Sequence, residues 1–181
     1  MPYTAASTVT AGDVYTSTAH NVIVNSLNSV GRAAFNVAQT SKTDIFSTTS
    51  TTFTDVTGLS VAITPSSATS KILVFVSIFC GPDVGAANFH GRLMRDSTAI
   101  SIGDAAGSRD RVSFWVHEST QGGMVTVAYL DSPATVSSVT YKVQVRGSGA
   151  GTIVVNRIDG ETDSVIYPRA ASNIIVAEIP V

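Results

Sequence analysis

The sequence is poor in charged side chains, which restricts the partners it could bind. Charged residues make up 13% of the 181 residues, about half of the ~25% that soluble domains usually carry. The formal net charge is −2, and the arginines are scattered along the chain. Binding to a phosphate backbone or to an anionic lipid surface needs clustered Lys and Arg. The sequence therefore predicts neither nucleic acid nor a membrane as a partner.

Cysteine and long hydrophobic runs are also scarce. Cys80 is the only cysteine, so no disulfide can form within the chain, and its apolar surroundings predict a buried hydrophobe rather than a reactive thiol. The longest apolar run, residues 72–76, is far shorter than the ~20 residues of a membrane-spanning helix. The first residues carry no signal-peptide pattern. We expect a protein made in a cytoplasm and stabilised by packing and by association.

Residues with metal-binding or phosphate-binding spacing are missing. His20, His90 and His117 stand apart, and the one neighbouring carboxylate, Glu118, would point to the opposite face of a strand from His117. The three carboxylates within residues 159–163 lack the EF-hand pattern. The glycines of residues 147–151 precede a strand, whereas a phosphate-binding loop requires a following helix. The sequence predicts no metal and no cofactor.

No motif for enzymatic catalysis is present, so we expect no catalytic residues and a protein that is not an enzyme. The chain has no Gly-x-Ser-x-Gly elbow between a strand and a helix. A glycosidase would need two carboxylates that face a groove. The available ones adjoin turns, where Asp commonly makes local hydrogen bonds; they are Asp96, Asp104, Asp110, Glu118 and Asp131.

Ser, Thr, Asn and Gly are abundant, and short strand patterns fill the chain from Ala34 onward. Residues 59–63 and 139–145 alternate between apolar and polar, which is typical of half-buried strands. Residues 71–80 are apolar on both faces and predict a central strand, covered by a second sheet or by another subunit. Further strands are expected at 89–94, 112–117, 124–130, 152–156 and 173–179. The predicted fold class is all-β, an antiparallel, jelly-roll-like β-sandwich over residues 34–181.

Residues 1–33 differ from the rest and are predicted to form an attachment segment. Ser17 or Thr18 can cap a short helix from Ala19 to Val30, with Gly31 placed to end it. Three asparagines make this helix marginal on its own, so it needs an apolar surface to pack against. That surface could belong to a neighbouring protein or to the β-domain itself, whose end the helix would then plug.

Several stretches resemble proteins of tailed bacteriophages. Residues 10–16, followed by the predicted helix, resemble the N-terminal segment of virion appendage proteins. Residues 53–65, 70–74, 93–96, 102–109, 129–133, 140–143 and 155–157 resemble, in order, a β-module of tail-fibre-like and other virion proteins. The resemblance implies a virion structural protein, displayed on the virion surface after synthesis in the host bacterial cytoplasm. It also implies a homotrimer bound to other virion proteins. Capsid decoration, a head fibre and a short tail appendage remain open.

Two other functions are considered. The first is a tail-fibre module that binds a host-surface glycan or another receptor through exposed loops. Sugar sites present an aromatic platform, for which Trp115, Tyr129 and Tyr167 are the candidates, although all three are expected in the core or at an interface. The second is a polysaccharide depolymerase, which no motif supports.

Overall fold

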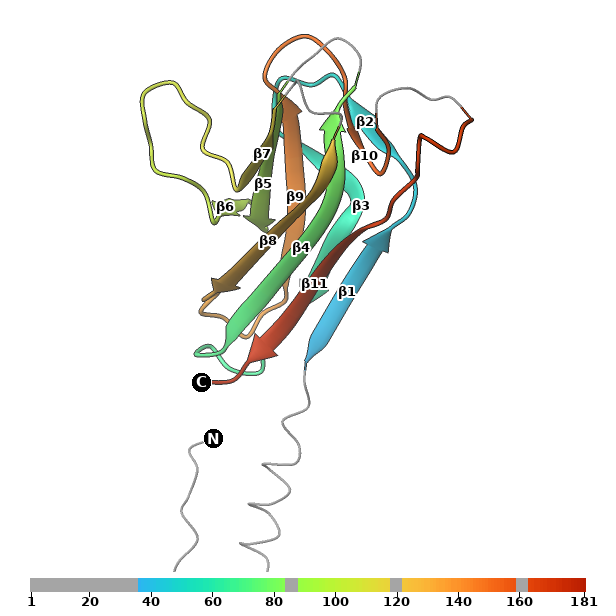
Figure 1. Cartoon of the computed structure of the whole chain (residues 1–181). Helices are drawn as coiled ribbons and strands as arrows, with labels where there is room; N and C mark the ends of the chain where they lie inside the picture. Colours follow the sequence, from blue (N-terminus) through green and yellow to red (C-terminus); the bar gives the residue numbers. More distant parts are fainter. Residues whose placement is uncertain (1–35, 84–87, 118–121, 159–162) are drawn as a thin grey trace, which may run out of the picture. The chain divides into compact units, whose positions relative to one another are not determined.

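The computed structural model describes residues 36–83, 88–117, 122–158 and 163–181. These residues form eleven strands in two antiparallel sheets and no helix, which confirms the all-β prediction (Figure 1). None of them therefore belongs to a helix that could cross a lipid bilayer. The predicted attachment segment, residues 1–33, and its helix lie outside the described residues and remain predictions.

The first sheet, called sheet A, has six strands. Its order is β1-β11-β4-β10-β2, and β8 pairs with the other edge of β4. The strands are β1 (Val37–Lys42), β2 (Phe46–Thr48), β4 (Lys71–Pro82), β8 (Gly123–Asp131), β10 (Ile153–Val155) and β11 (Ser172–Ile179). Figure 1 shows β8, β4, β11 and β1 side by side in one layer. The predicted central position of residues 71–80 is confirmed, because β4 has partners along both of its edges.

The second sheet, called sheet B, has five strands and faces sheet A across the core. Its order is β3-β9-β5-β6, and β7 also pairs with β5. The strands are β3 (Thr54–Ile63), β5 (Phe89–Arg95), β6 (Thr98–Ile100), β7 (Phe114–Val116) and β9 (Val139–Gly147). The two sheets form a sandwich-like fold. The strands predicted at 112–117 and 152–156 are real but shorter, as β7 and β10.

The core fills the space between the sheets with alternate residues of their strands. Sheet A contributes Ile72, Val74 and Val76 of β4, which are almost fully buried, and sheet B contributes Leu59 of β3 and Tyr141 of β9. A period of two places every second side chain of a strand on the inner face. This pattern explains why the alternation in the sequence locates these strands. Cys80 is buried among these residues, as predicted, and burial raises the pKa of its thiol.

Asn156 ties strand ends of sheet A together from a fully buried position. Its Nδ2 donates to the carbonyl oxygens of Lys42 and Asp44, at 2.8 Å each, and its Oδ1 accepts from Ser172 Oγ at 2.6 Å. Its φ of 67° lies in the left-handed region, which Asn tolerates better than other non-glycine residues. The side chain and the backbone thus both require asparagine here.

We predict that Asn156→Ala lowers the free energy of unfolding by about 2–4 kcal/mol. The change leaves the buried carbonyl group of Lys42 and the partly buried one of Asp44 without their donor, and it places alanine at a positive φ. Urea denaturation would measure the change in the free energy of unfolding. Asn173→Ala is the matched control, because it removes only a solvent-exposed hydrogen bond from Ser41 and should cost less than about 1 kcal/mol. Equal losses in both variants would contradict the role of Asn156.

Glu178 is a second buried polar residue that joins separate parts of the chain. Its carboxylate accepts hydrogen bonds from Ser66 N at 2.8 Å, Ser66 Oγ at 2.5 Å and Asn36 Nδ2 at 2.9 Å. Burial disfavours the charged form, but these hydrogen bonds outweigh it and lower the pKa of Glu178 from 4.5 to about 2. The ionised form therefore stabilises the folded state.

This pKa shift predicts how stability depends on pH. Because the folded-state pKa is depressed, the contribution of Glu178 is complete above about pH 5 and is lost as the pH falls towards about 2. We expect about 1–2 kcal/mol after solvent screening is allowed for. In Glu178→Gln, the free energy of unfolding should fall less steeply with decreasing pH in this range. Urea denaturation at several pH values would measure it. Asp104→Asn, which neutralises an exposed loop carboxylate, should keep the wild-type profile; a wild-type profile in Glu178→Gln would refute the assignment.

Candidate functional surfaces

The outer face of sheet A is mostly apolar where β1, β11, β4 and β8 lie side by side. Its outward positions also include uncharged polar residues, namely Gln39, Ser41, Ser77, Thr126 and Asn173. The register sets Leu73 between Ala177 and Leu130, and Phe75 between Ile175 and Ala128. We call this surface the apolar face; its residues are Val37, Leu73, Phe75, Phe79, Met124, Ala128, Leu130, Ile175, Ala177 and Ile179. Among the outward positions of these four strands, Lys71 at the margin is the one charged residue.

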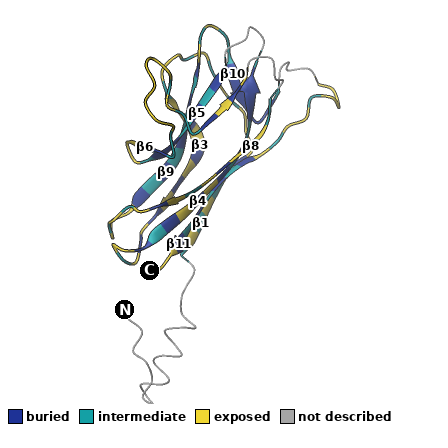
Figure 2. Ribbon diagram, turned by 60° about the vertical axis from the view of Figure 1, so that its left-hand side comes forward, coloured by how far each residue is buried: buried dark blue, intermediate teal, exposed yellow. Residues whose placement is uncertain are grey.

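The apolar face is open to solvent in the described part of the chain. Phe75 keeps 39% of its surface exposed, Leu130 47% and Met124 53%. Figure 2 shows exposed positions among buried ones along the strands of sheet A. The two-sided apolarity of residues 71–80 therefore has two outcomes: sheet B covers the inner side, and no described residue covers the outer side. Contiguous exposed apolar surface on a soluble domain marks an interaction site.

The outer face of sheet B has the opposite character. Cross-strand pairing puts Trp115 of β7, His90 of β5 and Arg146 of β9 in one row. Asp110, from the loop before β7, joins this row: its Oδ2 lies 2.6 Å from His90 Nδ1 and 3.3 Å from Arg146 Nε. The carboxylate is thus held by two partners on neighbouring strands.

The next row of sheet B carries Arg92 of β5 and Gln144 of β9. The guanidinium group of Arg92 lies 3.7 Å from the ring centroid of Phe53, a cation–π contact. Its Nε donates to the carbonyl oxygen of Arg111 at 2.7 Å. Gln144 Nε2 donates to Asp55 Oδ1 of β3 at 2.8 Å, on the other side of the same row.

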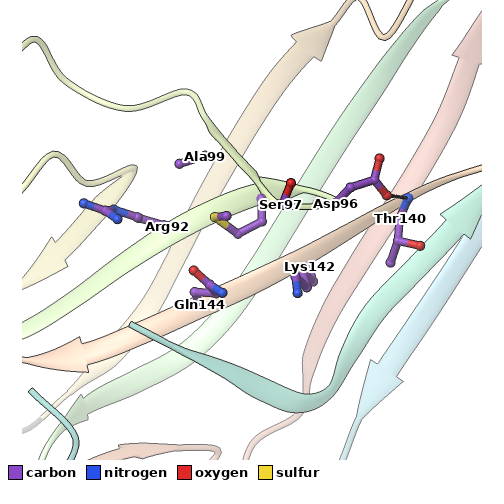
Figure 3. Close-up of a pocket in the computed structure, with 8 residues that line it drawn as sticks. Arg92, Asp96, Ser97, Ala99, Thr140, Lys142 and Gln144 are labelled. Carbon is purple, nitrogen blue, oxygen red and sulfur yellow. Dashed lines mark hydrogen bonds between the residues drawn. The ribbon is translucent and has the colours of Figure 1, made fainter. Parts of the chain in front are cut away.

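Two open pockets lie on this face. One, of about 700 Å³, runs along β5 and β9 and is lined by Arg92, Met94, Asp96, Ser97, Ala99, Thr140, Lys142 and Gln144 (Figure 3). Asp96 is committed to structure there, since its Oδ1 accepts a hydrogen bond from Thr140 N. The other, of about 440 Å³, is lined by His90, Ser108, Arg109, Asp110, Val112, Trp115, Arg146 and Ser148. We call it the Trp115 pocket.

The structure separates the three aromatic candidates. Trp115 is 52% exposed and so lies outside the core, which leaves an interface position as the prediction for it, whereas Tyr129 packs against the core, as expected. Tyr167 is half-buried in the segment before β11. The sequence did not single out Arg92 and Arg146. The signal that could have found Arg146 was the alternation of β9, which places residues 142, 144 and 146 on its polar side.

The candidate carboxylates do not share one site. Asp131 is buried; it accepts from Arg95 Nη1 at 2.9 Å and from Tyr141 Oη at 2.7 Å, across the two sheets. Burial, together with that hydrogen bond to Asp131, raises the pKa of Tyr141. Asp104 is exposed in the loop that contains Asp110. His20, Glu118 and residues 159–162 lie outside the described residues. Within the described segments, no three His, Cys, Asp or Glu side chains gather as a metal site would require.

The chain shows little similarity to known proteins. No family model and no curated protein matches the chain. Among solved structures, the chain is similar to one in the tripod (BppUct-A-L) from the baseplate of bacteriophage Tuc2009. The identity is 13% and the TM-score 0.26, over 98% of this chain and 99% of that chain. At such a TM-score the backbones superpose poorly, so the match carries no argument about function.

Proposed function

We propose that the protein is a non-enzymatic structural subunit of a tailed-phage virion. A jelly-roll-like β-sandwich is displayed on the capsid or on the tail as a homo-oligomer, and residues 1–33 attach it. The observation that carries the proposal is the apolar face, which a single described domain leaves uncovered. The resemblance of residues 53–157 to phage virion modules suggests that the assembly is a phage virion.

A second copy of the chain is the partner that fits the apolar face. The face is nearly free of charge, so copies of it can pack together around a symmetry axis without burying unpaired ions. One apolar row of the face is continuous over four neighbouring strands, from Val37 on β1 to Leu130 on β8. Closed symmetric oligomers bury the same surface in every subunit. The resemblance to phage modules favours three copies.

The charges of the domain support a structural function over a catalytic one. Asp131 is bound by Arg95 and Tyr141, and Asp110 by His90 and Arg146. In each case cationic or hydroxyl partners from sheet B hold the carboxylate in place. Neither pairing sets a second free carboxylate beside the first, as glycoside hydrolysis would require.

We predict that Phe75→Asp converts the oligomer to monomers without unfolding the domain. Phe75 is partly exposed in the single chain, so the charge stays hydrated there, but it would be buried without a partner at an interface. The loss should be about 3 kcal/mol or more of association free energy. Light scattering after size-exclusion chromatography would measure the mass, and a melting curve would check the fold.

Thr57→Asp, on an exposed outward position of β3, is the matched control and should stay oligomeric. A monodisperse wild-type monomer at micromolar concentration would overturn association through the apolar face. If such a monomer became an oligomer after removal of residues 1–33, the occupant of the face would be that segment.

Attachment makes a separate prediction. A truncated protein of residues 32–181 should remain folded, because the buried core described above is built from residues between Val56 and Val176. It should fail to join particles that lack the native copy. A melting curve and immunolabelling of purified particles would measure the two properties. Normal incorporation of the stable truncated protein would place attachment in the sandwich instead, and absence of the full-length protein from particles would refute the virion assignment.

A further inference from the structure

We propose that the Trp115 pocket binds an acidic pyranose, a sugar ring that carries a carboxylate, within a surface glycan. The inference goes beyond the proposed structural role and does not depend on it. It starts from the position of Trp115 in the lining of an open pocket of about 440 Å³, whose other polar residues are two arginines, two serines, one aspartate and one histidine.

The position of Trp115 is fixed by the packing beneath it. The neighbouring Phe114 points inward and lies against Gly91, where an added Cβ would come within 2.1 Å of the phenyl ring. Phe114 also stacks on Phe89, with centroids 5.9 Å apart. Alternation along β7 then directs Trp115 outward. The indole is half exposed on a rigid strand, and such a flat apolar surface can pack against the C–H face of a sugar ring.

Polar groups around the indole suit a ligand with many hydroxyl groups. Asp110 is held by His90 and Arg146, which orients its carboxylate while lone pairs remain to accept from sugar hydroxyls. Ser148 Oγ accepts from Asn88 N at 3.0 Å, and the described contacts leave its own hydrogen free to donate. An apolar platform flanked by a few fixed polar groups is the usual composition of small-ligand sites.

The charge of the pocket favours an acidic sugar over a neutral one. The lining carries two guanidinium groups, those of Arg109 and Arg146, and one carboxylate, that of Asp110, so the pocket is cationic within a chain of net charge −2. Arg109 is exposed and makes no described side-chain contact, whereas Arg146 is engaged by Asp110. Arg109 is therefore the residue placed to bind a carboxylate of the ligand, for which the guanidinium geometry is well suited.

The chain itself supplies the reporter for a test, because Trp115 is its only tryptophan. Full-length protein is titrated with methyl glucuronide, with methyl glucoside and with inorganic phosphate while tryptophan fluorescence is recorded. We expect saturable binding of the glucuronide with a Kd on the order of 1 mM. The glucoside should bind about tenfold more weakly, since it lacks the charge-assisted contact, and phosphate should leave the fluorescence unchanged.

Variants separate the contribution of Arg109 to binding from that of Trp115. Arg109→Gln should reduce glucuronide affinity to that of the glucoside, whereas Lys71→Gln, an equal loss of charge on sheet A, should leave it unchanged. Trp115→Ala should abolish saturation-transfer NMR signals from both sugars, and Val136→Ala, a truncated exposed residue elsewhere, should keep them. No saturable change up to about 100 mM glucuronide would overturn the proposal. Equal affinity for the two sugars would refute the acidic preference, and competition by phosphate at equal concentration would indicate a general anion site instead.

Discussion

The two-sided apolar character of β4 is the constraint on which the rest of the structure depends. Its inner residues, among them Ile72, Val74 and Val76, are buried against sheet B and supply the centre of the core. Its outer residues Leu73 and Phe75 are as apolar as the inner ones, yet no described part of the chain covers them. Each Å² of apolar surface left in water costs roughly 25 cal/mol. The inner face of β4 thus stabilises the single domain, and its outer face can stabilise an assembly of several domains.

The two outer faces of the sandwich divide the chemistry of the chain between them. Basic residues that are scattered in the sequence gather on one side, because Arg92, Lys142 and Arg146 occupy outward positions of neighbouring strands in sheet B. Arg109 and Arg111 join them from the loop before β7. Sheet A presents almost no charge on its outer face. Association through sheet A would therefore leave the charged face and its pockets turned towards solvent, where a ligand could reach them.

The sequence predicted the elements whose pattern is local and missed those that depend on distant partners. Alternation in residues 59–63 and 139–145 located β3 and β9, whereas β1, β2 and β6 are short and carry Ser and Thr that give no such pattern. β1 exists because it pairs with β11, more than 130 residues later, where Ser41 bonds to Asn173. The exposure of Trp115 was predictable, since Phe114 and Val116 on either side are the inward residues of β7. The Asp110 contacts were not, because they require the register between β5 and β9.

The few charged residues of the domain also help to hold it together in place of disulfides. Nearly every described ion pair sits where separate elements meet: Asp131 joins the two sheets through Arg95, and Asp55 binds Lys142 between β3 and β9. Glu178 links the end of β11 to the turn after β3 through Ser66. Such contacts need few charges but fixed positions, and the carboxylates of Asp131, Asp55 and Glu178 serve to hold the fold together. Binding at the surface then depends on groups that packing leaves accessible, among them the indole of Trp115 on sheet B and the guanidinium group of Arg109 in the loop before β7.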